Sequence, residues 1–319
     1  MSPIPRFLLL RSMRRRKIIK ALGAGMLASS VQSSGQSKGR SFKLRYILSS
    51  AMYGEMPLAS ILPEVAKAGC EAIDIWCRVH GNQREQIEFM GDAVAREMFE
   101  KHRVKPAVFT RYPLGPFGLR EEIKKVAKSF DAEIVVCGST GPRGPAGKEA
   151  KAAVRAFLEK MKPHIAVAEQ SGMKIAVENH SGQLLYHPDA IRYFAEFNTS
   201  PNLGIAFAPH HLHKFTNQIP ALIRELGDKN LPFMYFQEHS EGMHKKSTKA
   251  IEMQQLPGFG GGLDYKPIVK ALKDINYSGY CEIFMHPVPR GIPILPTVAE
   301  ITAVINRSRG YIAKCLEAI

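Results

Sequence analysis

Short apolar runs recur along the chain from residue 42 onward, each five to seven residues long and separated by longer stretches. Most of these runs are apolar on both faces and rich in valine and isoleucine, a pattern typical of strands buried inside a parallel sheet. The predicted strands cover residues 44–49, 72–76, 105–110, 133–137, 174–178, 203–208, 233–239 and 280–284. A sheet made of such strands needs other elements to cover both of its faces.

The stretches between the runs place apolar residues at helical spacing. They predict helices over residues 58–68, 92–102, 120–130, 148–170, 188–197, 220–226 and 265–275. Gly69 and Gly172 follow two of these stretches, and glycine is common just past the end of a helix. Strands that alternate with helices in this way indicate βαβ units and a parallel sheet.

Eight such units match the closed (β/α)₈ TIM barrel in number and in length, since this barrel typically takes about 250 residues. We therefore predict an α/β fold of this kind, with a single barrel domain over residues 41–319. The alternative is an open, doubly wound sheet, which needs a glycine-rich turn after its first strand. Ser49-Ser50-Ala51-Met52-Tyr53 is not such a turn.

The basic residues gather at the start of the chain. Residues 1–40 hold nine of the 44 lysines and arginines and none of the 29 acidic residues, so the net charge of +15 belongs mostly to this leader. Arg15 and Arg16 precede a short apolar stretch at residues 21–28. This pattern is typical of a twin-arginine signal peptide, so we expect export to the periplasm or the extracellular space. A disordered basic tail is the alternative. The apolar stretch is shorter than the roughly 20 residues of a membrane helix, and we expect no membrane association.

Polar residues follow the last four predicted strands, and in a TIM barrel such strand ends build the active site. The segments are Val177-Glu178-Asn179-His180, Ala208-Pro209-His210-His211, Gln237-Glu238-His239 and Glu282-Ile283-Phe284-Met285-His286-Pro287. Carboxylates brought together without a cation repel one another and tend to hold a proton. Mixed histidine and carboxylate ligation suits borderline divalent metals better than calcium. The sequence therefore predicts a metal site at this end of the barrel.

These segments, together with Ala72-Ile73-Asp74-Ile75-Trp76, resemble the sugar phosphate isomerase/epimerase family. Its members are xylose isomerase-like TIM barrels, and the superfamily also includes the AP endonuclease 2-type enzymes. The resemblance covers roughly residues 42–318 and implies one divalent metal ion, namely manganese, zinc, cobalt or magnesium. It implies ligation by Glu178, His239 and Glu282. Ala208 stands where the family has an aspartate ligand, and His211 or His210 is expected to replace that carboxylate.

The resemblance also implies an enzyme, a sugar isomerase or epimerase that acts on a small carbohydrate or polyol. A metal on adjacent carbonyl and hydroxyl oxygens stabilises the enediolate, while Glu178 and Glu282 exchange the proton as catalytic acid and base. The residues expected to bind substrate are His80, His180, His210, His211 and Arg290.

Three other functions remain open on the same barrel. A lyase or hydrolase of 3-keto-glycosides begins with the same proton abstraction. A non-catalytic carbohydrate-binding barrel is an alternative because Ala208 removes a ligand. A DNA-repair nuclease needs a basic face for phosphates, and the mildly basic body of this chain leads us to expect no nucleic-acid partner. Assembly into a homo-oligomer stays open.

Overall fold

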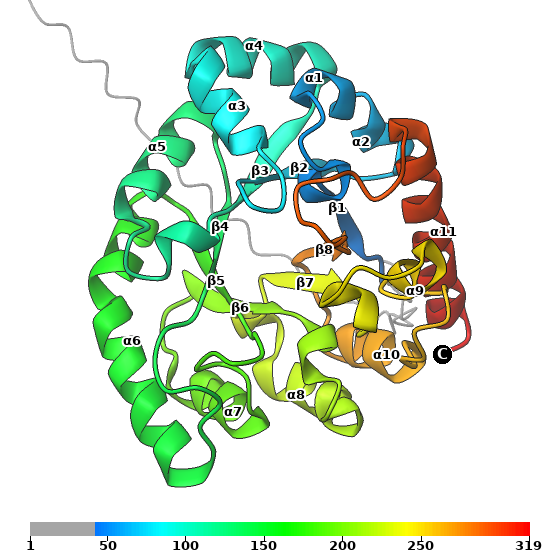
Figure 1. Cartoon of the computed structure of the whole chain (residues 1–319). Coiled ribbons are helices and arrows are strands. Elements are labelled where there is room, and N and C mark those ends of the chain that lie inside the picture. The colour runs from blue at the N-terminus through cyan, green and yellow to red at the C-terminus, as the bar shows by residue number, and fades with distance from the viewer. Residues whose placement is uncertain (1–41) are drawn as a thin grey trace, which may run out of the picture. The chain divides into compact units, whose positions relative to one another are not determined.

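The computed structural model describes residues 42–319, so the predicted leader and its export signal lie outside the described residues. Parallel strands follow one another in chain order around a closed barrel, in which β1 pairs with β8 (Figure 1). The strands are β1 (Arg45–Ser49), β2 (Ala72–Trp76), β3 (Lys105–Thr110), β4 (Ile134–Gly138), β5 (Lys174–Glu178), β6 (Leu203–Phe207), β7 (Phe233–Phe236) and β8 (Tyr280–Ile283). The predicted TIM barrel is confirmed, and the closing β1–β8 ladder excludes an open sheet.

Helices form a ring outside the barrel (Figure 1). They are α1 (Leu58–Ile61), α2 (Glu64–Lys67), α3 (Gln83–Met90), α4 (Asp92–His102), α5 (Arg120–Phe130), α6 (Gly147–Gln170), α7 (Pro188–Phe197), α8 (Ile219–Leu226), α9 (Lys249–Met253), α10 (Lys266–Asp274) and α11 (Val298–Glu317). The helix predicted over residues 58–68 is divided into α1 and α2, because Pro63 lacks the amide hydrogen that a continuous helix needs. No helix among the described residues is long and apolar enough to cross a membrane.

The beginning and the end of the barrel are joined by a buried hydrogen-bonded chain. Thr302 on α11 donates to Glu64 on α2 at 2.6 Å, and its hydroxyl also lies 3.2 Å from the Tyr53 hydroxyl. A capping box between Thr297 and Glu300 fixes the start of α11, because each side chain satisfies an amide that the helix leaves free. These contacts hold α11 against the elements that follow β1.

Two layers of side chains fill the C-terminal half of the barrel interior. Residues two apart on a strand point to the same side. Trp76 ends β2 and Phe284 follows β8, and both line a cavity at the C-terminal ends of the strands, which we call the mouth of the barrel. Asp74 and Glu282 precede them by two residues and are fully buried. An aromatic layer therefore lies under the mouth, with a layer of acidic side chains beneath it.

Candidate active site at the barrel mouth

A cavity of about 150 Å³ lies at the C-terminal ends of the strands; we call it the mouth cavity. Its lining residues are Trp76, His80, Tyr112, Glu178, His180, Gln183, His210, His211, Phe284, His286 and Arg290. Pockets for drug-sized ligands measure about 300–1,000 Å³. The mouth cavity is therefore suited to a smaller molecule.

One carboxylate and two imidazoles meet at this cavity. Glu178 is the last residue of β5, and His210 and His211 lie in the short 3₁₀ turn Pro209–Leu212 that follows β6. One ligand atom from each of the three residues lies within 4.8 Å of the others. His211 Nε2 is 3.4 Å from Glu178 Oε1. Neighbouring strands of a parallel barrel end on the same side, which is why β5 and β6 bring these residues together.

Hydrogen bonds from neighbouring loops orient this group. The Tyr112 hydroxyl donates to Glu178 Oε2, and the Ser181 hydroxyl lies 3.2 Å from His211 Nδ1. His180 Nδ1 lies 2.7 Å from the carbonyl oxygen of Ser181. Because a carbonyl oxygen only accepts, Nδ1 of His180 carries the hydrogen and its Nε2 keeps a free lone pair.

Burial sets the charge of these groups. Removal from water raises the pKa of Glu178 to about 7, against the opposing effect of His180. Burial lowers the pKa of His211 to about 3 and that of His80 to about 4. Burial also lowers the pKa of His210 well below its usual value. The imidazoles are therefore neutral near pH 7, which is the form that binds metal ions.

The donor set fits a borderline divalent metal. The side chains of Glu178, His210 and His211 are buried, and His210 Nδ1 has no hydrogen-bond partner among the described residues. A buried polar atom without a partner is costly, and metal ligation satisfies it. Two nitrogens and one carboxylate oxygen suit zinc, manganese, cobalt or iron.

The cavity also has an aromatic wall and a fixed cation. The rings of Trp76 and Phe284 stack at 4.7 Å with an interplanar angle of 14°. The Arg290 guanidinium donates to the carbonyl oxygens of Pro287 at 2.6 Å and Met243 at 2.8 Å, which holds it at the rim. The wall offers a flat apolar face, while the imidazoles and guanidinium offer hydrogen bonds for hydroxyl groups.

The structure gathers most of the residues selected from the sequence, but not all of them. Those that line the mouth cavity are His80, Glu178, His180, His210, His211 and Arg290. His239 lies outside this set and stacks on His213, with ring centroids 3.8 Å apart. The predicted metal ligand His239 is therefore not part of the group formed by Glu178, His210 and His211.

Glu282 also lies outside the mouth cavity, in the acidic layer beneath it. Together with Asp74 it forms what we call the acid pair. Thr110 donates to Asp74 Oδ2 at 2.7 Å, whereas neither oxygen of Glu282 has a hydrogen-bond partner within residues 42–319. Burial raises the pKa of Asp74 to about 7, and burial with the nearby Asp74 charge raises the pKa of Glu282 well above its usual value. In the structure the carboxyl group that interacts with Glu282 is that of Asp74. The pairing of Glu178 with Glu282 as acid and base stays a prediction.

The sequence analysis assigned no role to five residues that line the mouth cavity. They are Trp76, Tyr112, Gln183, Phe284 and His286. Trp76 ends β2 and Tyr112 follows β3, so attention to the ends of the first strands would have found both. Gln183 lies in the loop after β5, and its placement has no clear signal in the sequence.

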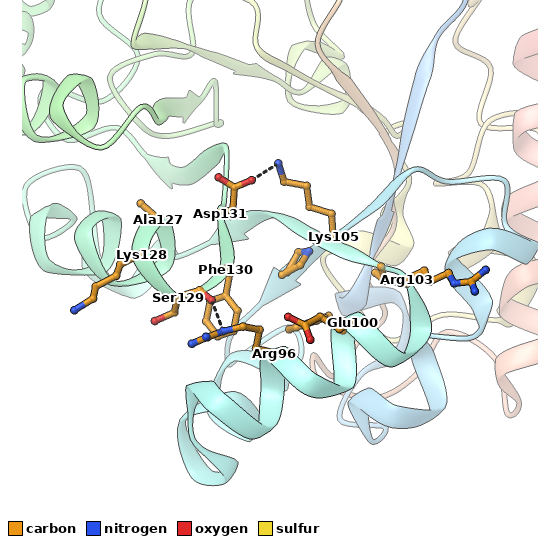
Figure 2. Close-up of a pocket in the computed structure, with 12 residues that line it drawn as sticks. Arg96, Glu100, Arg103, Lys105, Ala127, Lys128, Ser129, Phe130 and Asp131 are labelled. Carbon is orange, nitrogen blue, oxygen red and sulfur yellow. Dashed lines mark hydrogen bonds and ion pairs between the residues drawn. The ribbon is translucent and has the colours of Figure 1, made fainter. Parts of the chain in front are cut away.

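A second, larger concavity of about 640 Å³ lies at the N-terminal end of β3, between the C-terminal ends of α4 and α5; we call it the base hollow (Figure 2). Arg96 and Lys105 point across it in Figure 2. Arg96 donates to the carbonyl oxygen of Ser129 at 3.2 Å, and Lys105 pairs with Asp131 at 3.1 Å. This end of a TIM barrel serves stability rather than catalysis.

The chain belongs to the family of xylose isomerase-like TIM barrels, because the family model of that description matches residues 62–302. Two curated relatives are mannonate dehydratases. The protein from Endomicrobium trichonymphae is 30% identical over 133 residues, which cover 39% of this chain and 34% of the relative. The protein from Oceanobacillus iheyensis is 28% identical over 130 residues, which cover 34% of each. The matched part thus spans about a third of the length of these relatives.

Solved structures share the fold at low sequence identity. A structure of the IolI protein with a binding zinc atom has a TM-score of 0.66 at 18% identity, and the match covers 85% of this chain and 99% of that one. A D-tagatose 3-epimerase-like protein has a TM-score of 0.57 at 17% identity, with the same coverage. The probable 3-DHS dehydratase AsbF of Bacillus anthracis has a TM-score of 0.60 at 14% identity, covering 83% and 100%.

Proposed function

We propose that this protein is a metal-dependent enzyme that removes a proton from a carbon next to a carbonyl group of a small sugar or sugar acid. The observation that supports this most is the group of Glu178, His210 and His211, buried together in a cavity of monosaccharide size. A divalent ion held by these three residues would polarise the substrate oxygens and stabilise the charge that develops on proton removal.

The residues around the group support the proton transfer. Glu178 is the carboxylate among the lining residues of the mouth cavity and is the base in this proposal. The Tyr112 hydroxyl donates to Glu178 Oε2 and holds the carboxylate in place. Nε2 of His180 is free to accept a hydrogen bond from a substrate hydroxyl. The stacked rings of Trp76 and Phe284 exclude water from one side of the cavity.

A single carboxylate at the cavity favours reactions that need one base. Aldose–ketose isomerisation moves a proton between adjacent carbons, and one carboxylate is sufficient to carry it. Dehydration of a sugar acid starts with the same abstraction and then loses hydroxide. The curated relatives named as mannonate dehydratases make dehydration the second candidate. Epimerisation with two opposed glutamates is less well supported, because Glu282 does not line the mouth cavity.

Solvent exchange tests the proposal whatever the product of the reaction is. We would incubate the purified full chain with added manganese or zinc in D₂O, together with aldoses, ketoses and aldonates, and follow the proton next to the carbonyl by NMR. We expect its signal to disappear for one class. Formation of a ketose then identifies an isomerase, and formation of a keto-deoxy acid identifies a dehydratase.

Two glutamine variants locate the base. Glu178→Gln keeps the size of the side chain but removes its charge, and we expect it to lower the exchange rate by about 10²–10⁴-fold and to reduce bound metal. Glu282→Gln is the matched control one layer deeper, and we expect it to keep its metal and most of its activity. Stoichiometric metal without exchange of any substrate would indicate a non-catalytic barrel.

A further inference from the structure

A further concavity, which like the base hollow measures about 640 Å³, lies beside the mouth cavity; we call it the vestibule. Its lining residues are Ser181, Gly182, Tyr186, His213, Lys214, His239, Glu241, His244 and Lys245. It is built by the loops that follow β5, β6 and β7, and the first two of these strands also supply the metal-binding group.

The vestibule and the mouth cavity share a thin wall. Ser181 lines the vestibule, while its hydroxyl contacts His211 Nδ1 at 3.2 Å and its carbonyl oxygen accepts from His180 at 2.7 Å. The His180 and His211 rings on the other side line the mouth cavity, with centroids 3.9 Å apart. Ser181 therefore contacts the residues of the mouth cavity on one side and lines the vestibule on the other.

The vestibule is rich in hydrogen-bond donors and cations. The imidazoles of His213 and His239 stack at 3.8 Å, and the ring of His244 lies 5.5 Å from that of His239. Glu241 is the carboxylate of the lining, and Lys245 neutralises it at 2.5 Å. Lys214 forms no ion pair with any residue that the structure describes, so its ammonium group is available to a ligand.

The stacking of the first two imidazoles argues against a second metal site. Their rings are nearly parallel, with an interplanar angle of 19°. The lone pairs of an imidazole lie in the plane of its ring, so two stacked rings do not direct their nitrogens at one ion. Each imidazole carries at least one N–H group, so both rings can donate to a ligand, as can the Lys214 ammonium and the Tyr186 hydroxyl. Charge-assisted hydrogen bonds of this kind are the strongest that proteins make to oxyanions.

We propose that the vestibule binds an oxyanion, a carboxylate or a phosphate, at the end of the substrate that is remote from the reacting carbons. That the oxyanion belongs to the substrate rests on the proposed function, whereas binding of an oxyanion at the vestibule does not require that the protein be an enzyme. It narrows the substrate to a sugar acid or a sugar phosphate.

Inorganic phosphate and acetate are the probes of the site. We would titrate each into the full chain by calorimetry and compare three variants. Lys214→Gln removes the unpaired cation, and we expect affinity to fall by about five- to tenfold. Glu241→Gln removes the carboxylate of the lining and frees Lys245, so affinity is expected to rise by about two- to fivefold. Lys246→Gln changes a lysine that does not line the vestibule, and affinity is expected to stay within about twofold.

Glu178→Gln separates this proposal from the proposed function. Phosphate affinity that survives Glu178→Gln but falls in Lys214→Gln supports the vestibule, even when no substrate is turned over. Phosphate affinity that depends on Glu178 and not on Lys214 places the anion on a metal in the mouth cavity and overturns the inference. Absence of binding by both probes overturns it as well. The probe with the larger loss in Lys214→Gln shows which oxyanion the site prefers.

Discussion

The mouth cavity and the base hollow lie at opposite ends of the strands and differ in how their polar groups are satisfied. In the base hollow Arg96 and Lys105 have partners, and the other side of each group faces water. In the mouth cavity the Nδ1 atoms of His80, His210 and His286 are buried and have no hydrogen-bond partner among the described residues. The base hollow is the larger of the two.

The difference teaches that volume alone does not locate chemistry. Buried polar atoms are nearly always hydrogen-bonded in proteins, so a cluster of exceptions needs an explanation such as a ligand or an ion. The imidazole nitrogens without partners lower the stability of the folded protein, and they lie at the mouth cavity, where strand ends and loops converge. None of the described residues that line the base hollow (Figure 2) has a buried side-chain polar atom without a partner.

The largest expected effect separates the two ends directly. His210→Gln removes a neutral imidazole from the group with Glu178, and we expect loss of bound metal and a fall in turnover of about 100-fold or more. Arg96→Gln in the base hollow is the matched control, and turnover is expected to stay within about twofold. Elemental analysis and the D₂O exchange assay measure both. If both variants lost metal and turnover to the same extent, the proposed difference between the mouth cavity and the base hollow would be wrong.

An effect of intermediate size is expected on the pH dependence of stability, through the acid pair below the mouth cavity. Asp74 and Glu282 have pKa values raised by burial, so the folded protein holds protons that the unfolded chain has already lost above about pH 4.5. The free energy of unfolding therefore falls as the pH rises from about 4.5 through 7. Glu282→Gln removes one of these protons. We expect the loss of stability between pH 5 and pH 8 to be smaller in the variant by on the order of 1–3 kcal/mol.

Urea unfolding of both proteins at the two pH values measures this difference. The histidines contribute a dependence of the opposite sign, because their pKa values are lowered and their stabilising effect is lost as the pH falls below about 6.5. That contribution is common to both proteins and cancels in the comparison. A parallel pH dependence in wild type and variant would mean that Glu282 is ionised in the folded protein.

The smallest effect is expected in the base hollow. Lys105 pairs with Asp131 at 3.1 Å and Glu133 at 3.0 Å, and its side chain is 39% exposed. Lys105→Gln should lower the free energy of unfolding by about 0.5 kcal/mol at low salt, and by less at high salt because exposed ion pairs are screened. Urea unfolding in 50 mM and 500 mM salt (roughly a threefold change in Debye length) measures it. A change in turnover above about fivefold would assign the base hollow a role in the reaction.

The fold was readable from the sequence because burial on both faces leaves a clear pattern. The bounds of β2, β3 and β5 agree with the predicted runs residue for residue. Two helices show the limit. Pro63 divides one predicted helix into α1 and α2, and none of the predicted helices covers residues 298–317, where α11 lies.

The candidate site was readable only in part, because depth in the barrel depends on register between strands. The run predicted over residues 233–239 ends as a strand at Phe236, so His239 lies in a loop and turns to the vestibule. Glu282 faces the interior as expected but lies one layer too deep. Strand tilt and stagger decide which layer reaches the mouth, and these are properties of the closed barrel rather than of any one run. Ala208 stands where the resemblance implies an aspartate ligand, and this difference directed attention to His210 and His211, which the structure brings to Glu178.

The hydrogen bonds that join Tyr53 and Glu64 to Thr302 have a consequence for synthesis of the protein. Tyr53 and Thr302 are 249 residues apart in the chain. A ribosome adds about 5–20 residues per second, so the nascent β1 waits roughly ten to fifty seconds before the helix that secures it emerges. During that interval β1 has an unpaired edge, the kind of surface that aggregates or binds chaperones.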